Sequence, residues 1–241
     1  NIRLGPARIA MEAGKHVFCE KPLAISLEEA DEMLAIAARN NVRLGINFLL
    51  RYVPLYTTLR ALIEAQPLGK PVRMLFENYA GDLPTGHWFW DPARSGTILV
   101  EHGVHFFDIV DSLLGPGEVQ WAGRLQRASG AQDKWLAVLR YGDTFGTFYH
   151  AFDRPLEVER TALTVEFARG RVTLEGWIPT RMTVEGVGTL AEAEALAPSF
   201  PALEARALGG LHPVLANGET VMVSHRITGV VEAGEKQAVY A

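Results

Sequence analysis

The sequence predicts an α/β plus α+β fold. It places the C-terminal part of a parallel sheet over residues 1–49 and a large, predominantly antiparallel sheet with helices on one face over residues 50–241. Two observations predict this division. Helical and strand-like segments alternate in the first range, which is typical of βαβ units in a parallel sheet. From Glu118 onward, strand-like runs follow one another across short turns, which is typical of an antiparallel sheet with one covered face.

Composition limits the class of protein. The chain has 241 residues, 48% of them hydrophobic and 21% charged, which suits a globular protein with a real core. A net charge of −5 without a basic stripe argues against nucleic acid as a partner. No apolar run approaches the ~20 residues of a membrane span, so we expect no membrane partner. The single Cys19 excludes an intrachain disulfide and fits a reducing, cytoplasmic compartment.

The first range predicts a helix, a strand, a second helix and a second strand, over residues 6–14, 16–20, 26–40 and 42–48. Ser26 is a suitable N-cap for the second helix, because Glu29 follows three residues later and completes a capping box. The first strand is apolar and is expected to be buried in the parallel sheet.

Lys21-Pro22 follows the first strand directly. Because proline cannot continue a central strand, the chain must turn here, with a lysine at the carboxyl end of the strand. Ligands of open α/β sheets bind at that edge. The X–Pro sequence also makes this bond our candidate for a cis peptide.

The second range predicts a helix over residues 52–65 and a series of strands. The strand-like runs cover residues 71–79, 119–128, 135–141, 144–152, 160–168, 171–177 and 181–185. We interpret residues 190–208 as a loop with helical turns and expect a last helix near residues 219–231. That helix and the one over residues 96–115 would cover the sheet.

The helix predicted over residues 96–115 carries the main chemical signal. At about 100° per residue, its polar side chains Glu101, His105, Asp108 and Ser112 fall on one narrow stripe. Its other faces are apolar, which favours a buried helix that lines a site over a surface helix with a solvated stripe. Gly103 costs ~1 kcal/mol relative to alanine inside a helix, so we expect it to pack closely on another backbone.

Two separated motifs resemble one family. Residues 14–24, GKHVFCEKPLA, resemble the AGKHVxxEKP segment of the Gfo/Idh/MocA oxidoreductases, the glucose–fructose oxidoreductase and inositol dehydrogenase family. Residues 95–108, SGTILVEHGVHFFD, resemble its GGGxLxDxGxHxxD segment. The resemblance implies a Rossmann domain that binds NAD or NADP, followed by a sheet domain that shapes the site for a small sugar or polyol.

The resemblance also implies roles for residues. Lys21 matches the lysine near the reacting oxygen and the nicotinamide, with Glu20 and Pro22 beside it at the cofactor. His105 matches the acid/base histidine, and Glu101 stands where the family has aspartate. The chemistry is plausible in itself, because imidazole can take a hydroxyl proton near neutral pH and an ammonium stabilises an alkoxide. A carboxylate one turn away is expected to orient the ring and favour its charged form.

Further residues are candidate substrate contacts. Arg51 lies in a segment that keeps the family's Asn, Arg and Pro with extra spacing. The aromatic loop before the long helix either folds back over the core or lines a pocket. The candidate substrate contacts in this loop are His87, Trp88, Trp90 and Arg94. His102, on the helix itself, is a further candidate. The position of His102 on the helix favours a structural role.

The glycine-rich phosphate turn G-x-G-x-x-G occurs nowhere in the sequence. We expect that turn before Asn1, in a part of the Rossmann domain missing from this chain. Without its backbone amides, the chain alone should bind a dinucleotide poorly.

Three hypotheses remain for the function. The first is an NAD(P)-dependent dehydrogenase or reductase of a sugar or polyol, and the second is a non-catalytic sugar-sensing or scaffold relative. A metal-dependent hydrolase using His87, His102, His105 and Glu101 is the weakest, because no second histidine lies at metal-ligand spacing on the helix face; we expect no metal. The uncovered sheet face predicts a homodimer or homotetramer.

Overall fold

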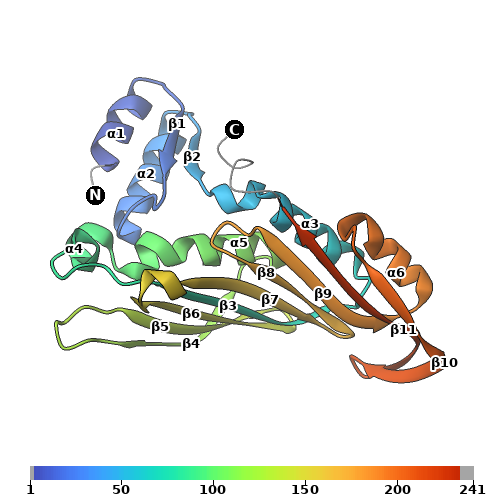
Figure 1. Ribbon diagram of the computed structural model, residues 1–241. Coiled ribbons are helices and arrows are strands. Elements are labelled where there is room, and N and C mark those ends of the chain that lie inside the picture. Colours follow the sequence, from blue (N-terminus) through green and yellow to red (C-terminus); the bar gives the residue numbers. More distant parts are fainter. Residues whose placement is uncertain (1–2, 234–241) are drawn as a thin grey trace.

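The computed structural model describes residues 3–233, and its N-terminal part is a small parallel βα unit (Figure 1). Its elements are α1 (Leu4–Glu12), β1 (Val17–Glu20), α2 (Leu27–Arg39) and β2 (Leu44–Asn47). The two strands pair in parallel, with Val17 opposite Leu44. The predicted order is confirmed. The first strand is not buried as expected, because it has one neighbouring strand and alternates in exposure, leaving Phe18 73% exposed.

The start of α2 follows the predicted capping chemistry. The Ser26 hydroxyl accepts a hydrogen bond from the Glu29 backbone N–H at 3.2 Å. Inside the helix, Met33 and Ile36 are fully buried against α1. Capping and periodic burial together explain why this segment is a helix.

The rest of the chain is built on a nine-stranded sheet in the order β10-β11-β9-β8-β7-β3-β6-β5-β4. The strands are β3 (Pro71–Gly81), β4 (Glu118–Leu125), β5 (Lys134–Tyr141), β6 (Thr144–Arg154), β7 (Arg160–Phe167), β8 (Gly170–Glu175), β9 (Arg181–Gly188), β10 (Glu204–Ala216) and β11 (Glu219–Glu232). Every neighbouring pair is antiparallel except β3 and β6, which run parallel. The predicted, mostly antiparallel sheet is thus confirmed.

Helices cover one face of this sheet (Figure 1). They are α3 (Pro54–Ala65), which follows a 3-10 turn η1 (Leu49–Tyr52), α5 (Val104–Leu114) and α6 (Leu190–Leu196). The core between the helices and the sheet includes Leu59, Ile109, Val165, Val172 and Phe200. In the described part of the chain no helix lies over the opposite face. The N-terminal unit stands over the beginning of α5, on the helical side.

The last predicted helix is wrong, because residues 219–231 form most of β11. The segment predicted as a loop holds α6, a 3-10 turn over residues 197–199 and the start of β10. The turn between the last two strands explains the result. Asn217 and Gly218 both have positive φ, 54° and 82°, as the primed turns of tight β-hairpins require. The asparagine–glycine pair was the missed signal for a hairpin.

The long helix starts later than predicted and not as an α-helix. A π-helical turn, η3 (Leu99–Gly103), precedes α5. The expected contact of Gly103 with another backbone is also wrong. A Cβ atom at Gly103 would meet the Leu99 side chain at 3.1 Å, so the glycine accommodates a neighbour from its own turn.

No helix within residues 3–233 combines the length and the apolarity needed to cross a membrane.

The β10–β11 turn makes a testable prediction. Gly218→Ala places a Cβ atom on a residue with φ of 82°, and we expect it to lower the free energy of unfolding by about 1 kcal/mol. Gly5→Ala is the matched control, because it lies in α1 with open space around its Cα. That change should stabilise by about 0.5–1 kcal/mol. Urea denaturation measures both; equal effects of the two variants would contradict the turn assignment.

Candidate functional site

Lys21 joins the two parts of the molecule. It lies directly after β1, in a cis peptide bond with Pro22, as the sequence suggested. Its ammonium donates hydrogen bonds to the Glu101 carboxylate at 2.8 Å and to the Glu101 carbonyl at 2.6 Å. Both side chains are largely buried, 17% and 19% exposed. Two motifs 80 residues apart therefore meet at one point.

The partner of Glu101 differs from the prediction. We expected its carboxylate to orient His105 from one helical turn away, but it is bound to Lys21. The His105 Nδ1 atom is buried and has no hydrogen-bond partner in the described part of the chain. The π-helical turn explains the change, because its wider winding breaks the i, i+4 alignment of an α-helix. The buried ammonium also attracts the carboxylate.

His105 is a buried, neutral imidazole. The residue is 3% exposed, and its ring makes an edge-to-face contact with Trp177 at 4.9 Å between ring centroids. Burial, and secondarily the Lys21 charge, lower the pKa of His105 to about 4. The expectation of a favoured charged form is therefore wrong, because the carboxylate that would favour it is engaged elsewhere.

His102 belongs to a second group of rings beside His105. Its ring stacks on Trp177 at 4.6 Å and 24°, and its Nδ1 atom lies 3.2 Å from His150 Nε2. His150 is buried on β6, and burial followed by the charge of His105 lowers the pKa of His150 to about 3. Burial also lowers the pKa of His102, with smaller effects of both histidines and of Lys21.

Sequence reasoning missed His150, Trp177 and Asn78 as members of this region. A signal was present for two of them. In the predicted strands, alternation places His150 and Asn78 on the same face as buried phenylalanines, and both are 2% exposed. A polar side chain on the apolar face of a strand needs a partner or a function.

A cavity of about 380 Å³ lies beside His102. Its walls come from the ends of β3 and β7 and from the turn after β8. The polar lining residues are Asn78, Asp82, His102, Glu159, Thr161 and Trp177. Because His102 and Trp177 also contact His105, the cavity opens next to the buried imidazoles.

A larger cavity of about 770 Å³ lies against α1 and β1. Glu20, Trp88 and Arg94 line it, together with Cys19 and Phe18. The candidate substrate residues are therefore divided: two from the aromatic loop face this cavity, whereas His102 faces the smaller one.

Other aromatic-loop residues serve the fold. His87 Nδ1 accepts a hydrogen bond from the Phe89 backbone N–H at 3.3 Å, which caps the 3-10 turn η2 (Trp88–Trp90). Phe89 packs on Phe152 at 4.9 Å. Trp90 donates to the Leu83 carbonyl at 3.3 Å. Phe89 and Trp90 thus belong to a cover on the core, whereas Trp88 and Arg94 line the larger cavity.

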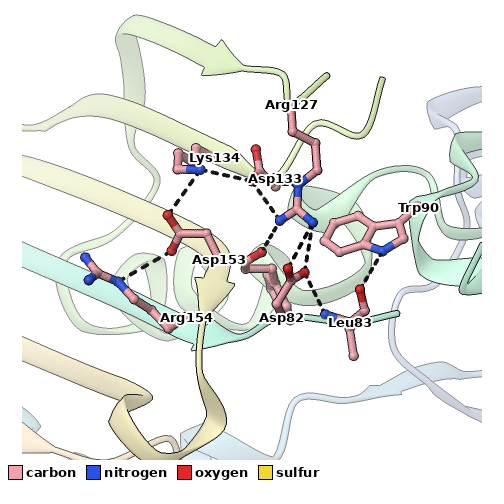
Figure 2. Close-up of polar contacts among 9 residues, drawn as sticks. Asp82, Leu83, Trp90, Arg127, Asp133, Lys134, Asp153 and Arg154 are labelled. Atoms are coloured by element: carbon pink, nitrogen blue, oxygen red, sulfur yellow. Dashed lines mark hydrogen bonds and ion pairs between the residues drawn. The ribbon is translucent and has the colours of Figure 1, made fainter. Parts of the chain in front are cut away.

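A charge network fixes this loop to the sheet (Figure 2). The Arg127 guanidinium donates to Asp82 at 2.9 Å and to Asp133 at 2.8 Å, and it lies 5.0 Å from the Trp90 ring centroid. Burial raises the pKa of Asp133, but hydrogen bonds from Lys134 and Arg127 outweigh that effect and lower it. The network thereby holds Asp82 at the wall of the smaller cavity.

Arg51 lies in neither of these two cavities. It donates to Asp108 through Nε at 2.8 Å, and the Asp108 side chain is 8% exposed. One turn further along α5, Ser112 accepts from Arg60 at 3.1 Å. The far half of the predicted polar stripe thus holds η1 and α3 in place. Arg51, our candidate substrate contact, is thus engaged by a buried carboxylate.

The metal-hydrolase hypothesis is not supported. Among residues 3–233 there is no group of three His, Cys, Asp or Glu side chains that could hold a metal ion. Of the four proposed ligands, Glu101 is bound by Lys21 and His87 caps its own turn.

The fold and the site define a class: a mixed α/β protein in which a parallel βα unit with a lysine at its strand end meets a helix-covered, mostly antiparallel sheet. Two family models match the chain. "Oxidoreductase family, NAD-binding Rossmann fold" matches residues 6–48, and "GFO/IDH/MocA C-terminal domain" matches residues 56–173. The chain belongs to the Gfo/Idh/MocA oxidoreductase family.

Relatives agree with this assignment. The chain is 28% identical to 1,5-anhydro-D-fructose reductase of Ensifer adhaerens, over 86% of this chain and 64% of that protein. It is 32% identical to scyllo-inositol 2-dehydrogenase (NAD(+)) of Bacillus subtilis, over 44% of this chain and 30% of that protein. An inositol dehydrogenase homologue from Azotobacter vinelandii, solved with NAD+, has a TM-score of 0.68 at 23% identity and covers 77% of this chain and 52% of its own. The chain thus spans less than two thirds of these relatives.

The buried histidines make stability depend on pH. A histidine whose pKa is lowered in the folded state binds its proton first in the unfolded chain, so stability falls as pH drops below about 6.5. The window extends down to pH about 4 for His105 and about 3 for His150. At pH 5, each of these two histidines should lower the free energy of unfolding by roughly 2 kcal/mol relative to its value at pH 7.5.

Urea unfolding of the His150→Asn variant at several pH values checks this prediction. The variant should lose part of the pH dependence between pH 7.5 and 5, whatever its absolute stability. His212→Asn changes an exposed histidine and should keep the wild-type dependence. Identical pH dependence in all three proteins would contradict the prediction.

Proposed function

We propose that this chain forms the substrate side of an NAD(P)-dependent oxidoreductase that interconverts a hydroxyl and a carbonyl group on a sugar or polyol. The observation that carries the proposal is the Lys21–Glu101 contact beside the neutral His105. It brings a proton donor and a proton acceptor to the carboxyl end of a parallel strand, where α/β folds bind ligands.

The described residues fit the nicotinamide end of a dinucleotide. Glu20 ends β1 and Lys21 follows it, and the Asn47 side-chain amide donates to the Glu20 carboxylate at 3.0 Å. The larger cavity lies against the same strand. When bound, the cofactor would accept or supply the hydride. The sequence has no G-x-G-x-x-G turn, so this chain offers no such turn for the pyrophosphate.

The side chains divide the acid–base work. Lys21 is a cationic donor that would stabilise an alkoxide, and Glu101 holds the ammonium in position. His105 is uncharged at neutral pH and can take the hydroxyl proton. In the reverse direction the same ring returns the proton to the nascent hydroxyl. Burial excludes bulk water from this exchange.

Relatives named as reductases and dehydrogenases of anhydrofructose and inositol support a polyhydroxylated substrate. A solved neighbour from Azotobacter vinelandii holds NADH and myo-inositol.

A second candidate function is sugar sensing without turnover. The observation that favours it is the unpartnered Nδ1 of His105, because family-type catalysis was expected to use a carboxylate to orient that ring. In this alternative the smaller cavity binds a sugar and no hydride is transferred.

We also propose that the uncovered sheet face pairs with a second copy of the chain to form a homodimer or homotetramer. Two large apolar side chains support this, Trp121 on β4 at 53% and Phe145 on β6 at 50% exposed. Sedimentation equilibrium tests the assembly, and a monomer at micromolar concentration would contradict it.

The lysine assignment predicts a loss of turnover. In the full-length gene product, Lys21→Met should reduce kcat by roughly 10²-fold or more, because the alkoxide loses its charged donor. Lys15→Met, an exposed lysine near the end of α1, is the matched control and should leave kcat unchanged. Steady-state assays with candidate polyols and NAD or NADP measure both. Equal rates in the two variants would refute the role of Lys21.

Cofactor titration separates the dehydrogenase from the sensor. We expect nicotinamide fluorescence of NADH or NADPH to change when the full-length protein is added. An intact protein that binds sugar but neither nucleotide would favour sensing.

A further inference from the structure

The smaller cavity is lined by a buried side-chain amide whose N–H group has no hydrogen-bond partner among the described residues. Asn78 is 2% exposed and lines this cavity. Its Oδ1 atom accepts a hydrogen bond from the Thr161 hydroxyl at 2.9 Å, which also fixes the orientation of the amide. Its Nδ2 group is buried without a partner among the described residues. An unpaired buried N–H costs about 1–3 kcal/mol, so a ligand that accepts this hydrogen bond would recover that energy.

His102 provides a second donor in the same cavity. Its Nδ1 lies 3.2 Å from His150 Nε2, so one of these nitrogens carries the proton. His150 Nδ1 is buried and has no partner in the described chain. If that atom carried the proton, a buried N–H would be left unpaired, which is rarer than an unpaired acceptor. His150 therefore donates through Nε2, and the N–H of a neutral His102 is on Nε2.

The charges around the cavity limit the ligand. Asp82 and Glu159 are both lining residues, and no lysine or arginine is among the residues that the structure places around the cavity. Arg127 pairs with Asp82 from outside the lining, whereas the Glu159 carboxylate has no ion-pair partner among the described residues, so a carboxylate or phosphate would meet an uncompensated negative charge there. An uncharged oxygen acceptor avoids this repulsion and still accepts from both N–H groups.

We propose that this cavity is a specificity subsite for an uncharged hydroxyl or keto oxygen of a sugar or polyol, held by Asn78 Nδ2 and His102 Nε2, and that it rejects the corresponding acid. The assignment rests on the proposed function in taking the cavity as part of the substrate site. His150 is a positioning residue here, because it acts only through the tautomer of His102.

The first test is equilibrium binding of matched sugar pairs to the chain by calorimetry, without cofactor. The probes are glucose with glucuronate, galactose with galacturonate, and myo-inositol as an uncharged polyol. We expect at least one uncharged probe to bind, and to bind at least 10-fold more tightly than its acid where a matched acid exists. Tighter binding of the acids, or no binding of any uncharged probe at about 50 mM, would overturn the proposal.

Variants test the two donors. Asn78→Asp keeps the acceptor toward Thr161 but replaces the donor, and should weaken binding of the uncharged probe at least 10-fold. His102→Asn keeps a polar atom near Nδ1 but loses Nε2, and should weaken it similarly. His102→Gln restores an amide N–H near the Nε2 position and should bind within about 3-fold of wild type. Asn217→Asp is the matched control: it makes the same asparagine-to-aspartate change in an exposed turn and should leave binding of the probe unchanged.

A measurement on the wild-type chain keeps the test decisive if a variant does not fold. Addition of the uncharged probe should shift the side-chain amide resonance of Asn78 in a ¹⁵N NMR spectrum. Unperturbed Asn78 and His102 resonances at saturating probe would overturn the subsite. Binding with these effects but no turnover in the full-length protein would leave the subsite standing and reject the oxidoreductase. Turnover that is insensitive to Asn78→Asp and His102→Asn would reject the subsite and leave the oxidoreductase standing.

Discussion

A buried ammonium bound to a carboxylate, Lys21 to Glu101, is the interaction on which the rest of the site depends. Two largely buried charges are tolerated only when they are paired and hydrogen-bonded, and here the lysine also donates to a backbone carbonyl. The pair links the end of β1 to the π-helical turn before α5. It therefore fixes how the N-terminal βα unit meets the large sheet, and it leaves the neighbouring imidazoles without a negative partner.

The absence of that partner defines the character of the histidine group. His102, His105 and His150 are all held neutral, mainly by burial. A neutral imidazole can accept a proton at one ring nitrogen and donate a hydrogen bond from the other. An imidazolium cannot do both, because both of its nitrogens already carry protons. The same burial makes them sensitive to acid. Function and instability at low pH thus have one physical cause in this molecule.

The polar stripe of the long helix is used for two different purposes. At its beginning, Glu101 takes part in the proposed chemistry. Further along, Asp108 binds Arg51, and its carboxylate anchors the segment that leads into α3. The Arg127 network likewise positions a loop, because it fixes the aromatic loop against the sheet. Buried charge in this protein is therefore mainly a means of positioning loops around the site.

The sequence by itself determined the alternation of the first four elements, the Ser26 cap, the helix that became α3 and most of the strands. Each depends on neighbours within a turn or a strand, so local periodicity and capping chemistry suffice to predict it. It also indicated Lys21, Glu101 and His105 as candidate catalytic residues. Only the tertiary structure decided that Glu101 pairs with Lys21, that Asp108 pairs with Arg51 and that His150 contacts the ring nitrogen of His102. Those choices depend on which groups lie closest after folding, across separations of 80, 57 and 48 residues, and no local pattern records such distances.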